Sequence, residues 1–225
     1  MGPALSPITE RTRVRRLPDK QLDDRAALDA VLDAGRVAHV AVLDESGQPY
    51  VVPVGYARAG DSVLFHGSTA SRLFRSLSAG AATCLTVTLY DGLVLARSTF
   101  ESSMHYRCAM VLGRAHQVDG AAKLRALEAI TEHLMPGRWA EARHPNRKEL
   151  AATLVLELPL TEWSVKVSDG PPDDAVEDLS RDIWAGVVPV RETHGEPRPA
   201  PDLRPGTGVP GYVRRWGRAP GDDRP

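Results

Sequence analysis

Three short runs of β-rich residues follow one another with only tight turns between them, and this feature limits the fold most. The runs are VAHVAVLD from Val37, QPYVVPVGYAR from Gln48 and DSVLFH from Asp61, and the turn sequences ESG and AGD separate them. Strands joined by such turns pair as an antiparallel meander. A βαβ array does not fit, because it needs a crossover of helix length between neighbouring strands.

Helical patterns stand before and between the other strands. LDDRAALDAVLDAG places Leu28, Val31 and Leu32 on one helical face, AAKLRALEAITEHLM has the same period up to Pro136, and a short helix is expected over 70–79. Further strands are predicted in ATCLTVTLYDGLVLARS, HYRCAMVLGRAHQV, TLVLELPL and WSVKVS. Six or seven short strands with two or three helices at their connections predict a mainly β (α+β) fold, a small antiparallel barrel with peripheral helices.

Composition divides the chain into three parts. Residues 1–20 hold four arginines between prolines and little apolar surface, which predicts a flexible N-terminal arm before a domain over 21–169. From Gly170 onward, 10 prolines and 8 glycines in 56 residues predict an irregular C-terminal extension, 170–225. Only the segment 178–190 has enough apolar character to dock on the domain.

Several classes of function do not fit the composition. A net charge of -1 lacks the basic excess of a nucleic-acid-binding protein. No apolar run could span a bilayer, and the N-terminus lacks the apolar segment of a signal peptide, so we expect a cytoplasmic protein. Cys84 and Cys108 form no CxxC pair, and the seven histidines show no HxH or HxxxH spacing. We therefore expect neither a disulfide framework nor a metal site.

The segment HGSTASR is the strongest candidate for binding chemistry. A strand-like run ends at His66, three small residues follow, and a helical pattern begins at Arg72. Unpaired N–H groups at a helix N-terminus attract phosphate, Gly67 allows close approach of the backbone, and Ser68 and Ser71 can donate hydrogen bonds. A serine-capped helix with a surface arginine explains the same residues. The residues alone leave both interpretations open.

The order of these segments resembles that of a known family. A helix, QPYVVPVGY, LFHGSTASR and VTLYDGLVLARSTFESSMHYRCAMVLG follow one another as in the pyridoxamine-phosphate-oxidase-like flavoproteins, over about residues 20–168. Within that superfamily the chain is most similar to the flavin-nucleotide-binding branch that includes nitroimidazole reductases. The resemblance implies a six-stranded antiparallel split barrel that binds FMN at the interface of a homodimer.

The resemblance also implies cofactor contacts. The phosphate motif of the family falls on His66, Gly67, Ser68, Ser71 and Arg72. The strand beside the isoalloxazine ring carries Val52, Pro53 and Val54. The family's second flavin segment matches SSMHYRC, which contributes Ser103, Met104 and Arg107, and Lys166 on the last strand is a further basic contact. His105 stands where the family commonly has asparagine, so its role differs from the family pattern.

These contacts imply an FMN-dependent oxidoreductase that reduces a small nitro or quinone-like compound with electrons from reduced nicotinamide. His66 and His105 are the candidate catalytic proton donors. Two alternatives remain. The first is a flavin or haem carrier or sensor without turnover, with His66 or His105 as the axial haem ligand. The second is a reductase that uses a deazaflavin in place of FMN.

Overall fold

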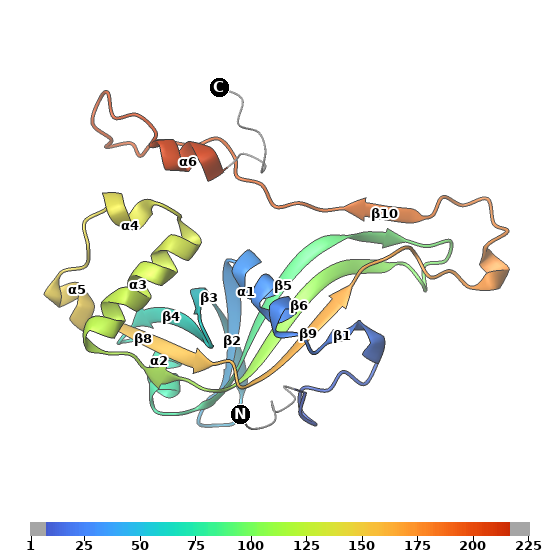
Figure 1. The fold of residues 1–225 in the computed structure, drawn as a ribbon, viewed down its shortest axis with the longest axis horizontal. Helices are drawn as coiled ribbons and strands as arrows, with labels where there is room; N and C mark the ends of the chain where they lie inside the picture. The colour runs from blue at the N-terminus through green and yellow to red at the C-terminus, as the bar shows by residue number, and fades with distance from the viewer. Residues whose placement is uncertain (1–7, 217–225) are drawn as a thin grey trace.

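The computed structural model describes residues 8–216, and the outermost parts of the expected N-terminal arm and C-terminal extension, 1–7 and 217–225, lie outside the described residues. Within 8–216 the chain forms one ten-stranded sheet in which paired strands run antiparallel (Figure 1). The strand order is β1-β9-β6-β5-β2-β3-β4-β8-β7, and β10 pairs with β5.

The strands are β1 Gln21–Leu22, β2 Val37–Leu43, β3 Pro49–Ala59, β4 Ser62–Ser68, β5 Ala82–Leu95, β6 Ser103–Arg114, β7 His116–Gln117, β8 Thr153–Pro159, β9 Glu162–Ser168 and β10 Gly186–Pro189. The α-helices are α1 Arg25–Ala34, α2 Arg72–Ser78, α3 Gly120–Leu134, α4 Arg138–Glu141, α5 Arg147–Ala151 and α6 Gly211–Trp216, and short 3-10 turns cover Pro18–Lys20 and Val176–Asp178. None of the helices between residues 8 and 216 has the length and apolarity that a membrane crossing requires.

The mainly antiparallel sheet with peripheral helices is the fold that the sequence predicts, but the number of strands differs. The sequence predicts six or seven strands and the structure has ten: the seven predicted segments form β2 to β6, β8 and β9, and the additional strands are β1 and β7, each two residues long, and β10 of the extension. A two-residue strand is too short to show alternation of apolar and polar residues. The apolar segment 178–190 does dock on the domain, through the pairing of β10 with β5.

Strand β3 has two different neighbours along its length. Its first seven residues, 49–55, pair with β2, and its last four, 56–59, pair with β4. Beyond Phe65, β4 leaves β3 and continues along β8 as far as Ser68. The sheet therefore divides at β3 into two halves, which is the split of a split barrel.

Two apolar clusters hold these halves together. The larger one fills the concave side of the sheet and includes Leu28, Val31 and Leu32 of α1, all at most 2% exposed. Helix α2 adds Phe74 and its neighbours to this cluster. The smaller cluster lies under α3, where Ile130 packs with apolar side chains of β3, β4 and β8. The leucines and valine predicted on one face of the first helix are thus core residues.

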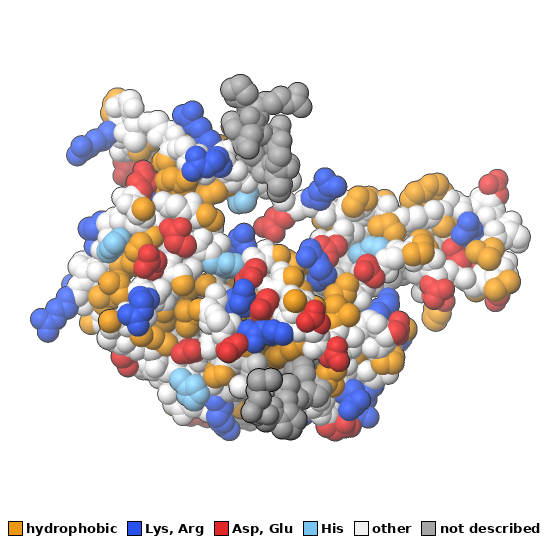
Figure 2. Space-filling model, in the orientation of Figure 1, with side chains coloured by type: hydrophobic (Ala, Val, Ile, Leu, Met, Phe, Trp, Pro, Cys, Tyr) orange, Lys and Arg blue, Asp and Glu red, His pale blue; other side chains and the backbone are white. Residues whose placement is uncertain are grey.

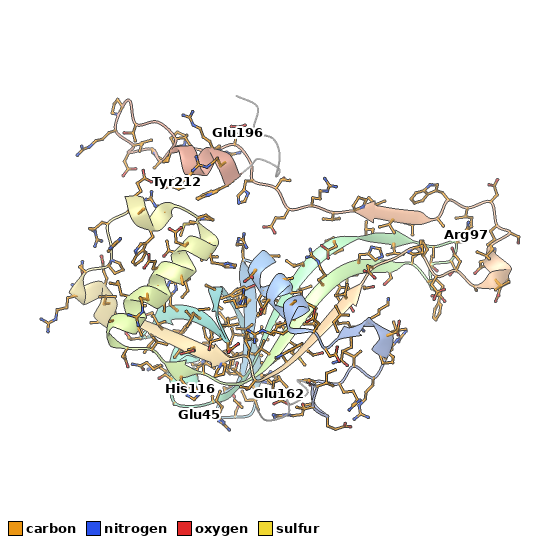
Figure 3. All side chains as sticks on the ribbon, in the orientation of Figure 1. Glu45, Arg97, His116, Glu162, Glu196 and Tyr212 are labelled. Atoms are coloured by element: carbon orange, nitrogen blue, oxygen red, sulfur yellow. The ribbon has the colours of Figure 1, made fainter. Side chains whose placement is uncertain are left out.

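The hairpin of β5 and β6 extends beyond the rest of the sheet, and we call residues 90–107 together with β10 the projection. Figure 1 shows it reaching away from α2 and β4, and Figure 3 places Arg97 near its far end. Asp174, which is nearly fully buried, accepts hydrogen bonds from the backbone N–H and the Nη1 of Arg97, the latter at 2.7 Å. This ion pair joins the tip of the hairpin to the extension.

The extension returns to the main body at α6. Trp216 Nε1 donates to the carbonyl oxygen of Pro136 at 3.1 Å, and the hydroxyl of Tyr212 contacts Arg138 and Glu141. Gly137 allows this contact, since an added Cβ would lie 2.9 Å from the Tyr212 ring. The extension is therefore attached at two places, β10 and α6, and residues 191–210 between them form no helix or strand.

Residues 8–20, the described part of the expected N-terminal arm, lie along β9. Arg11 and Thr9 both donate to the carboxylate of Glu162, and Thr12 is only 2% exposed. Gln21 then receives a hydrogen bond from the Val14 backbone. The division at residues 20 and 169 remains a prediction.

The C-terminal end of α1 meets β3 and α3 in a tightly packed junction. Tyr56 donates its hydroxyl to the Leu32 carbonyl at 2.6 Å, and His133 Nε2 lies 2.7 Å from the Gly35 carbonyl oxygen. An added Cβ on Gly35 would lie 2.4 Å from Val87 Cγ1. Burial raises the pKa of Tyr56 and lowers that of His133. The junction accepts neither extra volume nor charge.

We expect Gly35→Ala to destabilise the protein by roughly 1–3 kcal/mol, the usual effect of overpacking a core. The φ of Gly35 is -73°, which alanine adopts freely, so the loss would come from the contacts with Val87 and Tyr56. Urea unfolding followed by tryptophan fluorescence measures it. Gly195→Ala is the control, since nothing lies within 4 Å of its added Cβ. Equal stabilities of the two variants would contradict the packing.

The depressed pKa of His133 predicts sensitivity to acid. An unfolded chain takes up a proton at the ordinary histidine pKa of about 6.5, and the folded chain resists this until a lower pH. The stability that depends on neutral His133 is therefore complete above about pH 6.5 and declines as the pH falls. Urea midpoints between neutral and mildly acid pH should decline less for His133→Gln than for the wild type, whereas an unchanged slope would refute the assignment.

Candidate functional site

β3 and β4 stop pairing beyond Tyr56 and Phe65, and an edge of β3 without a strand partner results. Residues 49–55 of β3 have β2 on one side, and within the described chain no strand pairs with their other side. The end of β4 and the start of α2 lie across this gap. Backbone N–H and C=O groups on such an edge are available to a ligand. We call this region, residues 49–55 with 66–72, the crevice.

Arg72, the first residue of α2, is the charged group of the crevice. Its guanidinium carbon lies 4.2 Å from the centre of the Tyr50 ring, and no residue between 8 and 216 forms a salt bridge with it. The carboxylate of Asp44 lies close enough to Arg72 to interact with its positive charge. Its pKa is lowered mainly by the hydrogen bond from Ser46 and, to a smaller degree, by Arg72. The arginine is thus stacked on an aromatic ring and exposed toward an incoming anion.

The two serines of the motif differ in their local roles. Ser71 is the N-cap of α2, but its side chain makes no capping hydrogen bond. Ser68 Oγ accepts a hydrogen bond from the Ala70 backbone N–H at 3.1 Å and so shapes the turn. The ordinary capped-helix interpretation therefore does not account for Ser71.

Gly67 has a packing role within the chain. A Cβ at this position would lie 2.3 Å from the ring of Phe74, which belongs to the core. The sequence predicts that Gly67 lets a phosphate approach the backbone closely. The contact with Phe74 explains the glycine without any ligand, and contact with a phosphate remains a prediction.

His66 lies at the point where β4 has left β3. It is exposed and pairs through its backbone with Val155 of β8. Although part of the side chain is exposed, the surrounding protein atoms desolvate the imidazole and lower its pKa, which favours the neutral form. A neutral imidazole can accept a proton, donate a hydrogen bond or ligate a metal.

The three predicted residues of β3 do not share one face. Val54 is 9% exposed and belongs to the core, and Val52 is on the same side of the strand. Pro53 alternates with them and is exposed opposite His39 of β2. Contacts from Val52 and Val54 to a ligand would therefore come through their backbone.

The second predicted group lies at the root of the projection. His105 pairs with Gly92 of β5, and Arg107 forms a two-point ion pair with Asp91 at 2.7 and 2.9 Å. This bond is the main cause of the lowered pKa of Asp91, with His105 a smaller one. Ser103 and Met104 are exposed on the same strand. Arg107 therefore has its charge balanced within the chain, unlike Arg72.

Lys166 belongs to neither group. It pairs with Cys108 through the backbone of β9, and its Nζ lies 3.5 Å from the carbonyl oxygen of Arg16. The N-terminal segment thus accounts for the position of its ammonium group. A cofactor contact for Lys166 remains a prediction.

One chain does not bring the two predicted groups together. Val37, the first residue of β2, serves as a reference point along the strands. Gly92, the residue opposite His105, lies about four residues from this point toward the projection. Tyr50, under Arg72, lies five residues from it in the opposite direction. At about 3.3 Å per residue, the groups are separated by roughly 30 Å along the strands. Figure 1 shows the same opposition of the projection and α2.

Other chemistry is sparse in the described part of the chain. No group of three or more His, Cys, Asp or Glu residues within 8–216 could hold a metal ion. Burial is the main cause that raises the pKa of Cys84, a free thiol like Cys108. A cavity of about 490 Å³, lined in part by Cys84 and Arg114, shares only Pro49 with the crevice and includes none of the predicted site residues. The crevice is an open edge of the sheet and has no such enclosed volume.

Sequence reasoning missed Tyr50. It stands inside the quoted segment QPYVVPVGY, but alternation shows only that it shares a strand face with Val52. Its stacking under Arg72 joins β3 to α2, which are 22 residues apart in sequence. Residues so far apart in sequence leave no local pattern from which such a contact could be predicted.

Comparison with known proteins agrees with the fold and extends beyond the domain. A family model described as pyridoxamine 5'-phosphate oxidase matches residues 24–167. A FAD- and haem-binding protein from Mycobacterium smegmatis is 45% identical, with a TM-score of 0.84 over 88% of this chain and 97% of that one. A flavocytochrome from Azotobacter vinelandii is 39% identical, with a TM-score of 0.87 over 94% of this chain and 98% of that one. No curated protein sequence matches the chain.

A third structure shares the fold over a smaller part of the chain. A putative 5-nitroimidazole antibiotic resistance protein from Bacteroides thetaiotaomicron, 20% identical, covers 65% of this chain and 86% of its own, with a TM-score of 0.55, and shares the fold. Residues 1–169 are about three quarters of the chain, so matches of 88% and 94% must include part of the extension. The chain belongs to the pyridoxamine 5'-phosphate oxidase family of flavin-binding split-barrel proteins.

Proposed function

We propose that this protein is an oxidoreductase that binds a flavin and a haem. The observation that carries the proposal is the 45% identity to a FAD- and haem-binding protein over 88% of this chain and 97% of the other. The flavocytochrome, 39% identical over a still larger share, supports the same pair of cofactors. Both similarities include part of the extension.

The crevice suits the flavin. Arg72 offers a charge without an ion-pair partner in residues 8–216, Ser71 offers a hydroxyl that caps nothing, and the free edge of β3 offers backbone donors and acceptors. These groups hold and orient a flavin phosphate, and the flavin supplies the hydride or electron chemistry. FAD is the flavin that we propose, because the 45% identical relative binds FAD, in place of the FMN expected from the family resemblance.

His66 is the better fit of the two histidines expected as haem ligands. A haem needs only one protein ligand, and neutral imidazole is the form that binds iron. Part of the His66 side chain is exposed at the crevice, while the protein atoms around it desolvate the imidazole and lower its pKa, which favours the neutral form. His105 instead lies at the root of the projection, opposite Gly92 and near the carboxylate of Asp91, away from the crevice. Reduction of a nitro or quinone-like compound remains an expectation of the sequence.

A homodimer would complete the cofactor site. The outer face of the sheet carries large apolar side chains, 38–61% exposed, from β2 and β3 to the end of the projection: Val37, Leu43, Val51, Tyr90, Leu93, Leu95, Met104 and Val188. Figure 2 shows hydrophobic side chains along the projection. Such a surface favours a partner, and a second copy facing it would bring the second predicted group toward the crevice of the first.

The cofactor proposal predicts two absorption systems in the purified, haemin-reconstituted protein, a flavin band in the blue and a Soret band. His66→Ala should lose most of the Soret absorbance and keep the flavin band, because only the axial ligand is removed. The control is His144→Ala, whose ring stacks on Trp139 outside the crevice. Chromatography of the released flavin distinguishes FAD from FMN.

Two outcomes would change this assignment. A Soret band that survives His66→Ala and disappears in His105→Ala would move the haem ligand to the projection. A protein that retains no flavin, even after incubation with FAD and FMN, would refute the flavin part of the proposal.

The dimer proposal predicts a sedimentation mass of about twice 24.4 kDa. Leu93→Glu should shift the mass toward that of a single chain, because it buries a charge in the apolar face. Leu203→Glu, a similarly exposed leucine of the extension, should leave the mass unchanged. A wild-type mass of one chain would contradict the dimer.

A further inference from the structure

The far end of the projection carries large apolar side chains that the described chain leaves exposed. They come from the turn between β5 and β6 and from the first part of the extension, which the Arg97–Asp174 ion pair joins to that turn. Their exposed fractions are 48–85%, and a group of such side chains on a surface indicates a binding site for another molecule. We call them the tip patch: Phe100, Val176, Leu179, Ile183 and Trp184.

The surroundings of the tip patch are acidic. The arginines of these two segments, Arg97 and Arg181, are already paired with carboxylates. Figure 2 shows acidic side chains among the hydrophobic ones at this end of the molecule. Four further carboxylates of the segments form no salt bridge within residues 8–216: Glu101, Asp173, Glu177 and Asp182. An anionic membrane surface would repel them, so the tip patch suits an apolar protein surface with positive charge.

The outer face of the sheet has such a surface at its other end. The cavity of about 490 Å³ lies on this face, because its lining residue Cys84 faces the same way along β5 as Tyr90. Ala41 and Leu112, directly opposite Cys84 on the neighbouring strands, add to an apolar lining. Leu43, also in the lining, is 61% exposed. The cavity is thus an open, apolar depression.

The charged residues that line the cavity within the described chain are both arginines. Arg11 shares its charge with Glu162 of β9. Arg114 donates a hydrogen bond to the carbonyl oxygen of Gly80 and forms no salt bridge within residues 8–216. Its positive charge therefore remains available to a carboxylate from outside. The cavity and the tip patch are complementary in charge, and both are apolar.

A single chain cannot join these two surfaces. Arg114 is paired with Ala82 at the start of β5, and the tip patch lies beyond Leu95 at its end. At about 3.3 Å per residue, roughly 40 Å separate them. A second copy facing the outer face with its strands reversed would bring each end over the opposite end of its partner. With its strands in the same direction, it would place the acidic tips against each other, where like charges repel.

We propose that the tip patch of each copy docks on the cavity of the other copy. The inference rests on the proposed homodimer and adds which ends of the two sheets meet. Phe100 and its apolar neighbours pack against the apolar lining around Leu43, and the unpaired carboxylates lie near Arg114. A two-fold axis repeats the contact, so that it occurs twice in the dimer. The extension, which supplies four of the five residues of the tip patch, thereby becomes part of the interface.

Crosslinking tests which ends meet. Full-length protein with Cys84→Ser and Cys108→Ser lacks its native thiols, and Phe100→Cys and Leu43→Cys are added to the same chain. A short bismaleimide should then give a two-chain band on a denaturing gel, because the two positions are too far apart to be linked within one chain. The matched control combines Leu43→Cys with Leu203→Cys, a similarly exposed leucine of the extension, and should give no such band.

Sedimentation measures what the contact contributes. Phe100 is 85% exposed within its own chain, so Phe100→Ser leaves the core intact and should raise the dissociation constant of the dimer about tenfold or more. Arg114→Glu should weaken the dimer more than Arg114→Gln, because the reversed charge repels the carboxylates of the tip. Arg125→Glu, at an exposed position of α3, changes the net charge equally and should leave the dissociation constant unchanged.

The possible failures differ in what they refute. A wild-type protein that sediments as a single chain would refute the homodimer itself, and this inference with it. A dimer in which Phe100→Cys alone is linked to its counterpart in the other copy would show that the tips meet each other. A dimer that gives no link between positions 100 and 43, with unchanged affinity of Phe100→Ser, would place the tip patch outside the interface. Both of these results would overturn the inference and leave the dimer standing.

Discussion

The division of β3 between two neighbours is the constraint on which the rest of the molecule depends. β2 pairs with one edge of β3 as far as Gly55, and β4 pairs with the other edge only from Tyr56 onward, so the second edge of residues 49–55 has no strand partner in the described chain. Leu134 of α3 closes against Gly55, where an added Cβ would lie 2.8 Å from it. Helix α3 thus covers β3 near Gly55, where the pairing changes from β2 to β4. The crevice lies on the other side of this point.

The crevice and the projection are two consequences of the same arrangement. The sheet stays continuous through β2, which pairs with β5 over only three residues, and β5 then runs on with β6 where β2 has ended. One end of the molecule therefore has an edge without a strand, and the other end has strands without a covering layer. Groups that the family pattern joins at one cofactor lie at these opposite ends of a single chain.

Much of the fold could be predicted because burial on one side of a strand or helix leaves a period in the sequence. Leu28, Val31 and Leu32 show this for α1, and the run from Val37 shows it for β2. This period does not show which residues of neighbouring strands pair with one another. It could not reveal how far β5 and β6 extend past β2, nor that β10 would lie beside them.

The candidate site was predictable to a smaller extent, for a related reason. The motif HGSTASR identified the turn and Arg72, but residue type alone could not separate two uses of a glycine, and Gly67 turns out to face Phe74. Tyr50 had no signal at all, because its contact with Arg72 crosses from β3 to α2. Local chemistry names candidates, and only the tertiary arrangement shows which of them meet.

The two attachments of the extension make it a restraint as well as a covering. Residues 191–210 run from β10 on the projection to α6 on the α3–α4 side, with prolines at 197, 199, 201, 205 and 210. Proline-rich chain is stiff and extended, at about 3.1 Å per residue. The segment therefore sets an upper limit to the distance between its attachments. Bending of the projection away from the body would be resisted by covalent chain, and a single break in this segment would free that motion while leaving every strand of the sheet in place.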